Sequence, residues 1–239
     1  MLWFRERRGV TNIRLPSALE ATIDGVPLTP AQKHAQVLVL IQAGADTTGT
    51  ALGSTLNFLL THPSSLAKVR AEIDKADDAG LLSTPIQYEQ TQKYLPYMIA
   101  CIKEGGLRLR PPATNLFTRI VGPGGSKVGS VHVPEGFEIT TNAYVVQRDP
   151  ELFGPDPETF RPERWIEADE KRLAEMESGM FVFGTGPRMC IGKNIALFEL
   201  YKLLPEVSWL LTWCGFCGRL EGTDEILLFR LFDGSTWSL

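Results

Sequence analysis

Residues 30–62 form a stretch rich in apolar residues that is far too long for a strand and long enough for one α-helix. Proline suits the first helical turn and ends a preceding helix. One long helix is therefore predicted to begin at Thr29 and Pro30 and to end at Pro63. A helix over this range would be about 45 Å long and would cross a domain. A second, amphipathic helix is predicted over residues 64–80, where Gly80 ends it.

A third helix is predicted from Pro96 to the point where Pro111 and Pro112 stop it. The period then changes, and short strands are predicted over residues 115–121, 128–133 and 136–140, with a turn at 134–136. A short helix capped by Asn142 follows, and the proline-rich residues 149–165 predict an irregular, packed meander rather than any regular element. With a last helical pattern over 195–204, the predicted fold is mainly α with a small β region (α+β).

Composition narrows the class of protein. The 239 residues are 44% hydrophobic and carry a net charge of −4, which is too balanced to suggest a nucleic-acid partner. The longest apolar runs, residues 37–41 and 209–213, are far shorter than the roughly 20 residues of a membrane span, and no signal peptide opens the chain. Four scattered cysteines favour a reducing compartment. We therefore expect a soluble, cytoplasmic chain without an anchor.

The stretch FVFGTGPRMCIG, residues 181–192, surrounds one cysteine with glycines directly before a helical pattern. Glycines allow backbone angles that a side chain forbids, and they let another group approach closely. The positive end of the following helix favours a thiolate at Cys190, while Arg188 supplies a cation for an anionic cofactor edge. The alternative interpretation is a buried free cysteine at a helix start.

This stretch resembles the haem-binding loop of the cytochrome P-450 family, Phe-x-x-Gly-x-Arg-x-Cys-x-Gly. All five fixed positions match: Phe183, Gly186, Arg188, Cys190 and Gly192. The resemblance implies a haem b cofactor whose iron takes the Cys190 thiolate as its axial ligand, an arrangement that favours O–O cleavage. It also implies that Arg188 pairs with a haem propionate.

The resemblance covers residues 25–207, so the expected fold is the C-terminal part of the P-450 fold, with the N-terminal half missing. Residues 1–24 would be an N-terminal remnant. Residues 208–239 would be an atypical tail, because three of the five tryptophans and two of the four cysteines fall there. We hypothesise that this tail is a mistranslated intron or a frameshift, which transcript sequencing across codon 207 would test.

The centre of the long helix, AGADTTG at residues 43–49, contains weak helix formers where strong ones are expected. Threonine and aspartate side chains compete for backbone carbonyls and can open or bend a helix. By the family resemblance, the helix crosses the distal haem face here, and Thr47 and Asp46 help to protonate iron-bound oxygen. The alternative is a bent core helix without a chemical role.

The segment KEGGLRLRPP departs from the family, which has Glu-x-x-Arg on this helix. Glu104 and Arg108 are four residues apart, because two glycines stand where one residue is expected. A π-bulge would absorb the extra residue and keep the pair together, whereas without one the two parts of the helix turn by about 100° against each other. We expect a structural triad of Glu104, Arg108 and Arg164, the last from FRPERW. The alternative is an exposed ion pair worth about 0.3–0.5 kcal/mol.

Two further motifs are weaker. Arg119 resembles a strand arginine of the family that binds a haem propionate, although a solvated rim residue is the alternative. Cys214 and Cys217 form WCGFC, which looks like a thioredoxin-type motif but lacks the following helix that a dithiol site requires.

The predicted function is that of a haem-thiolate monooxygenase, which inserts one oxygen atom of O2 into a small apolar organic substrate. Its electrons would come from a separate NADPH-dependent reductase, because the sequence contains no dinucleotide-binding motif. The parent enzyme is expected on the endoplasmic reticulum membrane, by analogy with microsomal, fungal-like members of the family. Two alternatives remain open: a non-catalytic remnant of such an enzyme, and a dithiol oxidoreductase acting through Cys214 and Cys217.

Overall fold

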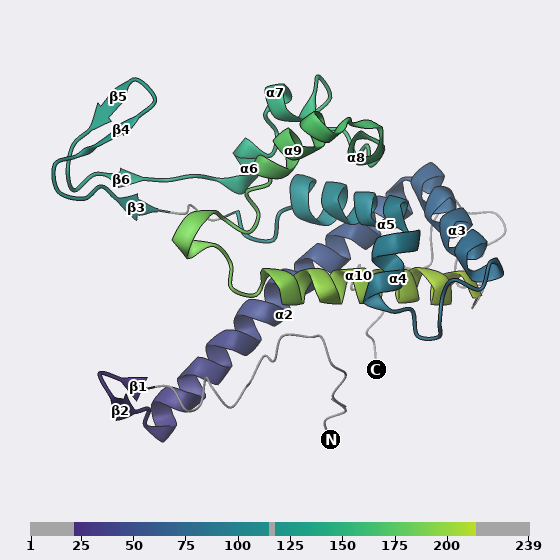
Figure 1. The fold of residues 1–239 in the computed structure, drawn as a ribbon, viewed down its shortest axis with the longest axis horizontal. Coiled ribbons are helices and arrows are strands. Elements are labelled where there is room, and N and C mark those ends of the chain that lie inside the picture. Colours follow the sequence, from purple (N-terminus) through teal and green to yellow (C-terminus); the bar gives the residue numbers. More distant parts are fainter. Residues whose placement is uncertain (1–21, 115–117, 214–239) are drawn as a thin grey trace, which may run out of the picture. The chain divides into compact units, whose positions relative to one another are not determined.

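A computed structural model describes residues 22–114 and 118–213, with backbone only for 210–213. The contacts divide the chain into two units, one ending at Ala45 and the other beginning at Asp46, and each is described here by itself. Cys214 and Cys217 lie outside the described residues. Figure 1 labels the elements of both units.

The first unit contains a small hairpin and the start of the long helix. Strands β1 (Thr22–Ile23) and β2 (Val26–Pro27) pair antiparallel around a turn in which Asp24 and Gly25 have positive φ. Helix α2 (Pro30–Thr61) then begins one residue after Thr29, as predicted. The Gln32 amide donates to the Thr29 hydroxyl over 3.3 Å, and the Thr29 amide donates to the Gln32 side-chain oxygen over 2.9 Å. This reciprocal pair satisfies donors that a helix start leaves free.

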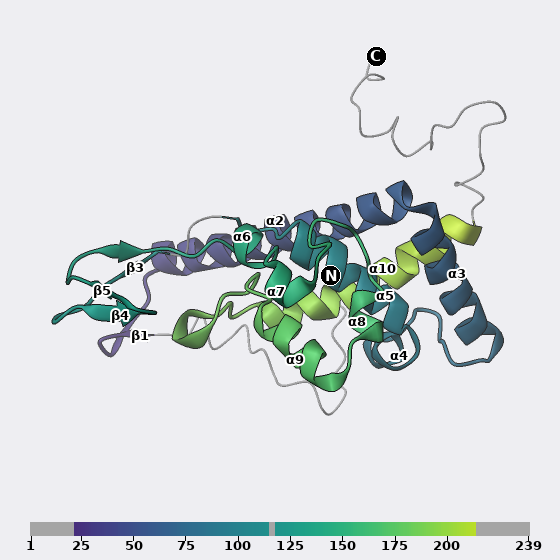
Figure 2. The same cartoon turned by 90° about the horizontal axis from the view of Figure 1, so that it is seen from above.

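Four further helices and the later part of α2 supply the core of the second unit. They are α3 (Pro63–Asp78), α4 (Tyr88–Tyr94), α5 (Pro96–Cys101) and α10 (Lys193–Trp213). Helix α10 packs against α3 and α4, and α5 packs against α3 (Figure 2). The fully buried side chains at their contacts are aliphatic or sulfur-containing: Leu59, Val69, Leu95, Met98, Ile102 and Leu204. The predicted helices over 30–63, 64–80 and 195–204 are confirmed, and α4 is an element that the sequence pattern did not reveal.

The third predicted helix changes type along its length. It is α-helical over α5 and continues as a π-helix, η1 (Ile102–Leu109). The amide of Arg110 donates to the Gly105 carbonyl over 3.0 Å, five residues back, which closes the last turn of η1. Pro111 then ends the helix, as predicted, because it has no N–H to continue the ladder.

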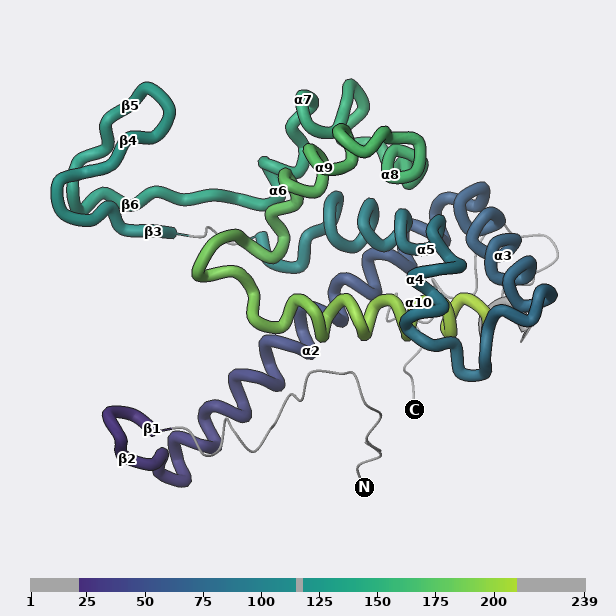
Figure 3. The backbone as a smooth tube through the Cα atoms, in the orientation of Figure 1, coloured from purple at the N-terminus to yellow at the C-terminus, as the bar shows by residue number. Residues whose placement is uncertain are grey.

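The β region consists of two antiparallel pairs, which can be followed along the chain in Figure 3. Strand β3 (Arg119–Ile120) pairs with β6 (Glu138–Ile139), and β4 (Ser126–Val128) pairs with β5 (Val131–Val133). The prediction of one strand over residues 128–133 is wrong, because Gly129 takes a φ of +59° and turns the chain between β4 and β5. The predicted turn at 134–136 is confirmed by the donation of the Phe137 amide to the Pro134 carbonyl.

The predicted meander is partly regular. Helix α6 (Ala143–Val146) precedes it, and the Asn142 side chain accepts from the Tyr144 amide over 2.8 Å, which confirms the predicted cap. The expectation of no regular structure over 149–165 is wrong, because α7 (Pro150–Phe153) forms there and α8 (Arg164–Glu167) begins there. Asp149 caps α7, so a proline at the first turn favours the helix instead of preventing it. Helix α9 (Glu170–Ser178) and the 3₁₀ turn η2 (Gly186–Arg188) complete the order.

The described chain is therefore mainly helical with small two-stranded sheets, which confirms the predicted fold class. None of its helices, within the two described ranges, is both long and apolar enough to cross a bilayer.

Candidate functional site

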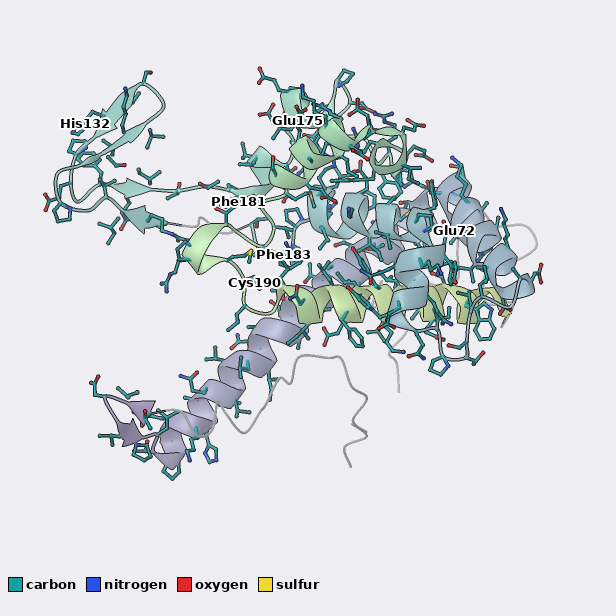
Figure 4. The ribbon with its side chains drawn as sticks, in the orientation of Figure 1. Glu72, His132, Glu175, Phe181, Phe183 and Cys190 are labelled. Carbon is teal, nitrogen blue, oxygen red and sulfur yellow. The ribbon has the colours of Figure 1, made fainter. Side chains whose placement is uncertain are left out.

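Figure 4 labels Phe181, Phe183 and Cys190 on the loop that precedes α10. Backbone hydrogen bonds hold this loop. The Gly184 amide donates to the Phe181 carbonyl and the Cys190 amide to the Phe183 carbonyl, each over 2.8 Å. Gly184 and Gly186 both have a φ of +66°, a region in which a side chain is strained. Two glycines are thus required by the backbone. A third, Gly192, lies outside this φ region.

The thiol of Cys190 is exposed three residues before the first residue of α10. Close to it in sequence, three apolar side chains are also exposed: Met189 by 49%, Ile191 by 97% and Ile195 by 42%. Exposed apolar side chains grouped around a possible ligand atom are typical of a surface that receives an apolar partner. The interpretation of Cys190 as a buried structural cysteine is wrong, whereas the second described cysteine, Cys101, is fully buried.

Both candidate propionate partners are exposed cations. Arg188 lies in η2, two residues before Cys190. Arg119 lies in β3, where its guanidinium donates to the Thr118 carbonyl over 2.9 Å. Within the part of the chain that the structure describes, neither arginine forms an ion pair, so both guanidinium groups keep donors for an anion.

The residues of the loop fit a haem group. Haem iron needs only one protein atom as its axial ligand, because the porphyrin supplies the equatorial nitrogens. Accordingly, the described residues contain no group of three or more His, Cys, Asp or Glu side chains that could hold a metal ion by themselves. The exposed thiol, its exposed apolar neighbours and Arg188, two residues before it, match the iron, the apolar ring and the anionic edge of such a group.

Asp46 and Thr47 lie in α2, at the start of the second unit. Asp46 is exposed, Thr47 is half-buried, and the neighbouring Thr48 is buried. We expected that the helix could open or bend here. Helix α2 is continuous from Pro30 to Thr61, so it does not break at these residues, and a bend stays a prediction. A threonine hydroxyl can bond the carbonyl four residues back without breaking a helix, as the Thr55 hydroxyl does with the Ala51 carbonyl over 2.8 Å.

The structure brings Glu104, Arg108 and Arg164 together in one buried ion-pair network. Arg108 binds the Glu104 carboxylate with two nitrogens, over 2.8 Å and 2.7 Å, and the Arg164 Nε binds it over 2.8 Å. The side chains of Glu104 and Arg108 are fully buried, and that of Arg164 is 2% exposed. An exposed pair worth a few tenths of a kcal/mol is therefore excluded.

The π-helix explains how the network tolerates the extra glycine. In η1 the hydrogen bonds run five residues back, so the turn between Glu104 and Arg108 holds one more residue than an α-turn. The two side chains consequently stay on the same face in spite of their unusual spacing. The widened turn replaces the rotation of about 100° that an α-helical insertion would cause.

Two partners of this network were missed by the sequence reasoning. The Trp165 indole Nε1 donates to Glu104 Oε2 over 2.8 Å, and the Arg161 amide donates to Glu104 Oε1 over 3.1 Å. Trp165 could have been found, because it stands beside Arg164 and an indole N–H needs a partner when buried. The Arg161 amide carries no signal in the sequence.

The end of η1 is capped by side chains from a distant part of the chain. Gln147, fully buried, donates to the carbonyls of Leu107 and Arg108 over 2.8 Å and 2.9 Å, and Arg108 donates back to the Gln147 carbonyl over 2.9 Å. Arg148 donates to the Leu109 carbonyl over 2.7 Å. These carbonyls need such donors, since the last turn of any helix leaves its carbonyls free.

A second carboxylate, Glu163, ties the meander to two helices. It accepts hydrogen bonds from the Lys68 ammonium over 2.6 Å and from the Tyr97 hydroxyl over 2.7 Å. Burial alone would raise the pKa of Glu163, but these two hydrogen bonds outweigh it and lower the pKa below its ordinary value. Burial and the Glu163 contact raise the pKa of Tyr97 far above its ordinary value. This cluster was not predicted, because its members are far apart in the chain.

Fold and loop together define a class: a mainly helical protein whose glycine-rich loop presents one exposed cysteine before a long helix. The sequence profile of the cytochrome P450 family matches residues 7–207. The chain therefore belongs to the cytochrome P450 family, and this family implies a haem cofactor. The match begins before residue 25, where our predicted domain starts, and ends at 207, where that domain ends. The three-part division at 24 and 207 stays a prediction.

Several curated fungal proteins are similar to the chain. It is 41% identical over 167 residues to the cytochrome P450 monooxygenase cicH of Emericella nidulans, covering 70% of this chain and 33% of that protein. It is 40% identical over 181 residues to the cytochrome P450 monooxygenase ABA1 of Pyricularia oryzae, covering 75% and 35%. It is 39% identical over 180 residues to a pisatin demethylase of Fusarium vanettenii, covering 75% and 33%. The chain thus spans about a third of the length of these relatives.

Proposed function

We propose that Cys190 is the axial ligand of a haem iron and that the chain is the haem-thiolate part of a cytochrome P450 monooxygenase. The observation that carries the proposal is the exposed thiol on a loop whose two left-handed glycines aim it outward, with exposed apolar side chains beside it. The names of the fungal relatives support the same chemistry.

Haem, when bound, supplies an iron centre at which O2 is activated, and thiolate ligation favours cleavage of the O–O bond. In the proposed reaction one oxygen atom enters an apolar organic substrate, and the other leaves as water with two electrons and two protons. Cys190 would hold the iron, the apolar Met189 and Ile191 beside it would help to keep water from the bound sulfur, and Arg188 and Arg119 would neutralise the propionates. Phe183, Gly186 and Gly192 shape the loop.

Asp46 and Thr47 are proposed as the proton donors. Asp46 is exposed and can exchange protons with water, whereas the half-buried Thr47 hydroxyl is the next polar group along α2. The two residues would help to deliver protons toward the reacting oxygen. Glu104, Arg108 and Arg164 would take no part in the chemistry and would hold the meander to the helical core.

The family implies an organic substrate, O2 and a redox partner. We propose that the partner is an NADPH-dependent reductase and that the whole protein works on the endoplasmic reticulum. We propose a small apolar organic substrate; one of the relatives is named as a pisatin demethylase.

Haem binding by the chain is tested by expressing it with a haem supply and recording the spectrum of the reduced carbon-monoxide complex. A red-shifted Soret band of the thiolate type is expected, and Cys190→Ser should abolish it. Cys101→Ala is the matched control, since it removes the buried thiol and should keep the band. A chain that binds no haem, or a band that survives in Cys190→Ser, would contradict the proposal.

A further inference from the structure

The glycine pair of η1, Gly105 and Gly106, lies directly against α2. Both residues are buried. A Cβ atom on Gly106 would stand 2.3 Å from the Thr55 hydroxyl oxygen and 2.5 Å from the Ala51 carbonyl oxygen. A Cβ atom on Gly105 would stand 2.9 Å from the ring of Phe58. Only residues without a side chain fit at this contact as it stands.

The same π-turn therefore serves two contacts at once. Its charged side chains, Glu104 and Arg108, bind Arg164 of the meander, while its glycines meet the backbone of α2. The extra residue widens the turn, and the absence of a Cβ leaves room for α2 beside it. The extra glycine, which departs from the family pattern in the sequence, therefore fits the packing around it in the structure.

The contact lies close to the proposed proton donors. The buried residues of α2 form one stripe that begins directly after Thr47: Thr48, Ala51, Thr55 and Leu59. Ala51, whose carbonyl meets Gly106, is one helical turn beyond Thr47. The Thr55 hydroxyl donates to that same carbonyl over 2.8 Å, so the touching surface of α2 is itself fixed.

We propose that the glycine pair is a positioning element that sets where α2 carries Asp46 and Thr47. This proposal rests on the proposed function, because the position of α2 affects proton delivery only if Asp46 and Thr47 are the proton donors. A Cβ at 106 needs about 3.5 Å from the Ala51 oxygen, so α2 and η1 must separate by about 1 Å. A displacement of this size in a catalytic group is enough to lower a rate about 100-fold.

The displacement can be measured without haem in the whole 239-residue chain. Cys214→Ser and Cys217→Ser remove two thiols, and Cys101 is buried and therefore protected from labelling. One spin label is placed on Cys190 and the other on Thr50→Cys, at an exposed position of α2, and the distance between the two labels is measured. A second labelled pair, Thr50→Cys with Ala174→Cys in a Cys190→Ser background, measures the shift along another direction. Gly106→Ala should move at least one of the two distances by about 1 Å.

Gly179→Ala is the matched control. Its Cβ would meet the flexible Leu152 side chain at 2.7 Å, far along the chain from α2, so it perturbs packing without pushing on a backbone. It should leave both distances unchanged. If Gly106→Ala moves Thr50 no more than Gly179→Ala does, the glycine pair does not position α2 and the inference is overturned.

Gly105→Ala carries the test if Gly106→Ala fails to fold. Phe58 is stacked on Phe160, with ring centroids 4.8 Å apart, so its ring cannot turn away freely and α2 should move with it. Adding Phe58→Ala to Gly105→Ala should restore the distances of the parent chain. If Gly105→Ala moves neither distance and the added Phe58→Ala changes nothing, the inference is overturned. Because these distances need no haem, loss of the Soret band would refute the proposed function without deciding this question.

Discussion

Replacing Glu104 by glutamine is expected to be one of the most destabilising isosteric changes in the chain. The glutamine keeps the volume but removes the charge from a fully buried carboxylate that binds Arg108 twice and Arg164 once. The buried guanidinium of Arg108 is then left without a counter-charge, and Arg164 keeps only its longer pair with Asp156, over 3.3 Å. Removing one partner of a buried ion pair costs about 3–5 kcal/mol, so the free energy of unfolding should fall by about that amount.

Urea unfolding of the full chain measures this loss. With a denaturant slope of about 2 kcal/mol per molar, the midpoint should fall by about 1.5–2.5 M. Glu177→Gln is the control, because its pair with Lys103 has a similar length, 2.6 Å, but is half-exposed and should cost less than about 1 kcal/mol. Equal midpoints for the two variants would refute the reasoning that burial makes the Glu104 network strong.

Three further outcomes are expected. The pKa of Glu163 is lower in the folded chain than in the unfolded chain, so its ionised carboxylate stabilises the fold above the unfolded pKa, and this stabilisation is lost as pH falls through the folded pKa. Glu163→Gln should therefore lower the free energy of unfolding near neutral pH. In unfolding measured against pH, the same variant should lose less stability on acidification than the parent chain does. In a Cys214→Ser, Cys217→Ser background, a thiol reagent should modify the exposed Cys190 quickly and the buried Cys101 only after unfolding. Burial raises the pKa of the Cys101 thiol and so disfavours its reactive thiolate. Equal modification rates for the two thiols would contradict this prediction. Gly184→Ala should cost about 1–2 kcal/mol in thermal unfolding, because alanine is strained at a φ of +66°, and a neutral result would contradict the loop geometry.

Much of the helical fold was predictable because its signals are local. The apolar period, Thr29 with Pro30, and the prolines at 63, 96 and 111 fix where α2, α3 and the α5–η1 helix begin or end. The cysteine loop was equally accessible, because its glycines and cysteine are contiguous. The turn at Gly129 was missed since one glycine between apolar residues fits a strand as well as a hairpin.

The network around Glu104 was only partly predictable because its contacts join distant residues. The spacing of Glu104 and Arg108 allowed either a π-bulge or a rotated helix, and local sequence does not choose between them. Packing against α2 and the meander makes that choice in the structure. Gln147 and Glu163 were missed for the same reason, since neither belongs to a motif that marks its partner.

The remote caps of η1 have a consequence for biosynthesis. The last turn of η1 depends on Gln147, which lies 39 and 40 residues downstream of the carbonyls it binds, and Glu104 depends on Arg164, 60 residues downstream. At roughly 5–20 residues per second, a ribosome needs about 3–12 s to add those 60 residues. During that interval the nascent segment holds a carboxylate and a guanidinium that cannot yet be buried with all their partners. This half of the helix therefore folds late, after the meander has left the exit tunnel.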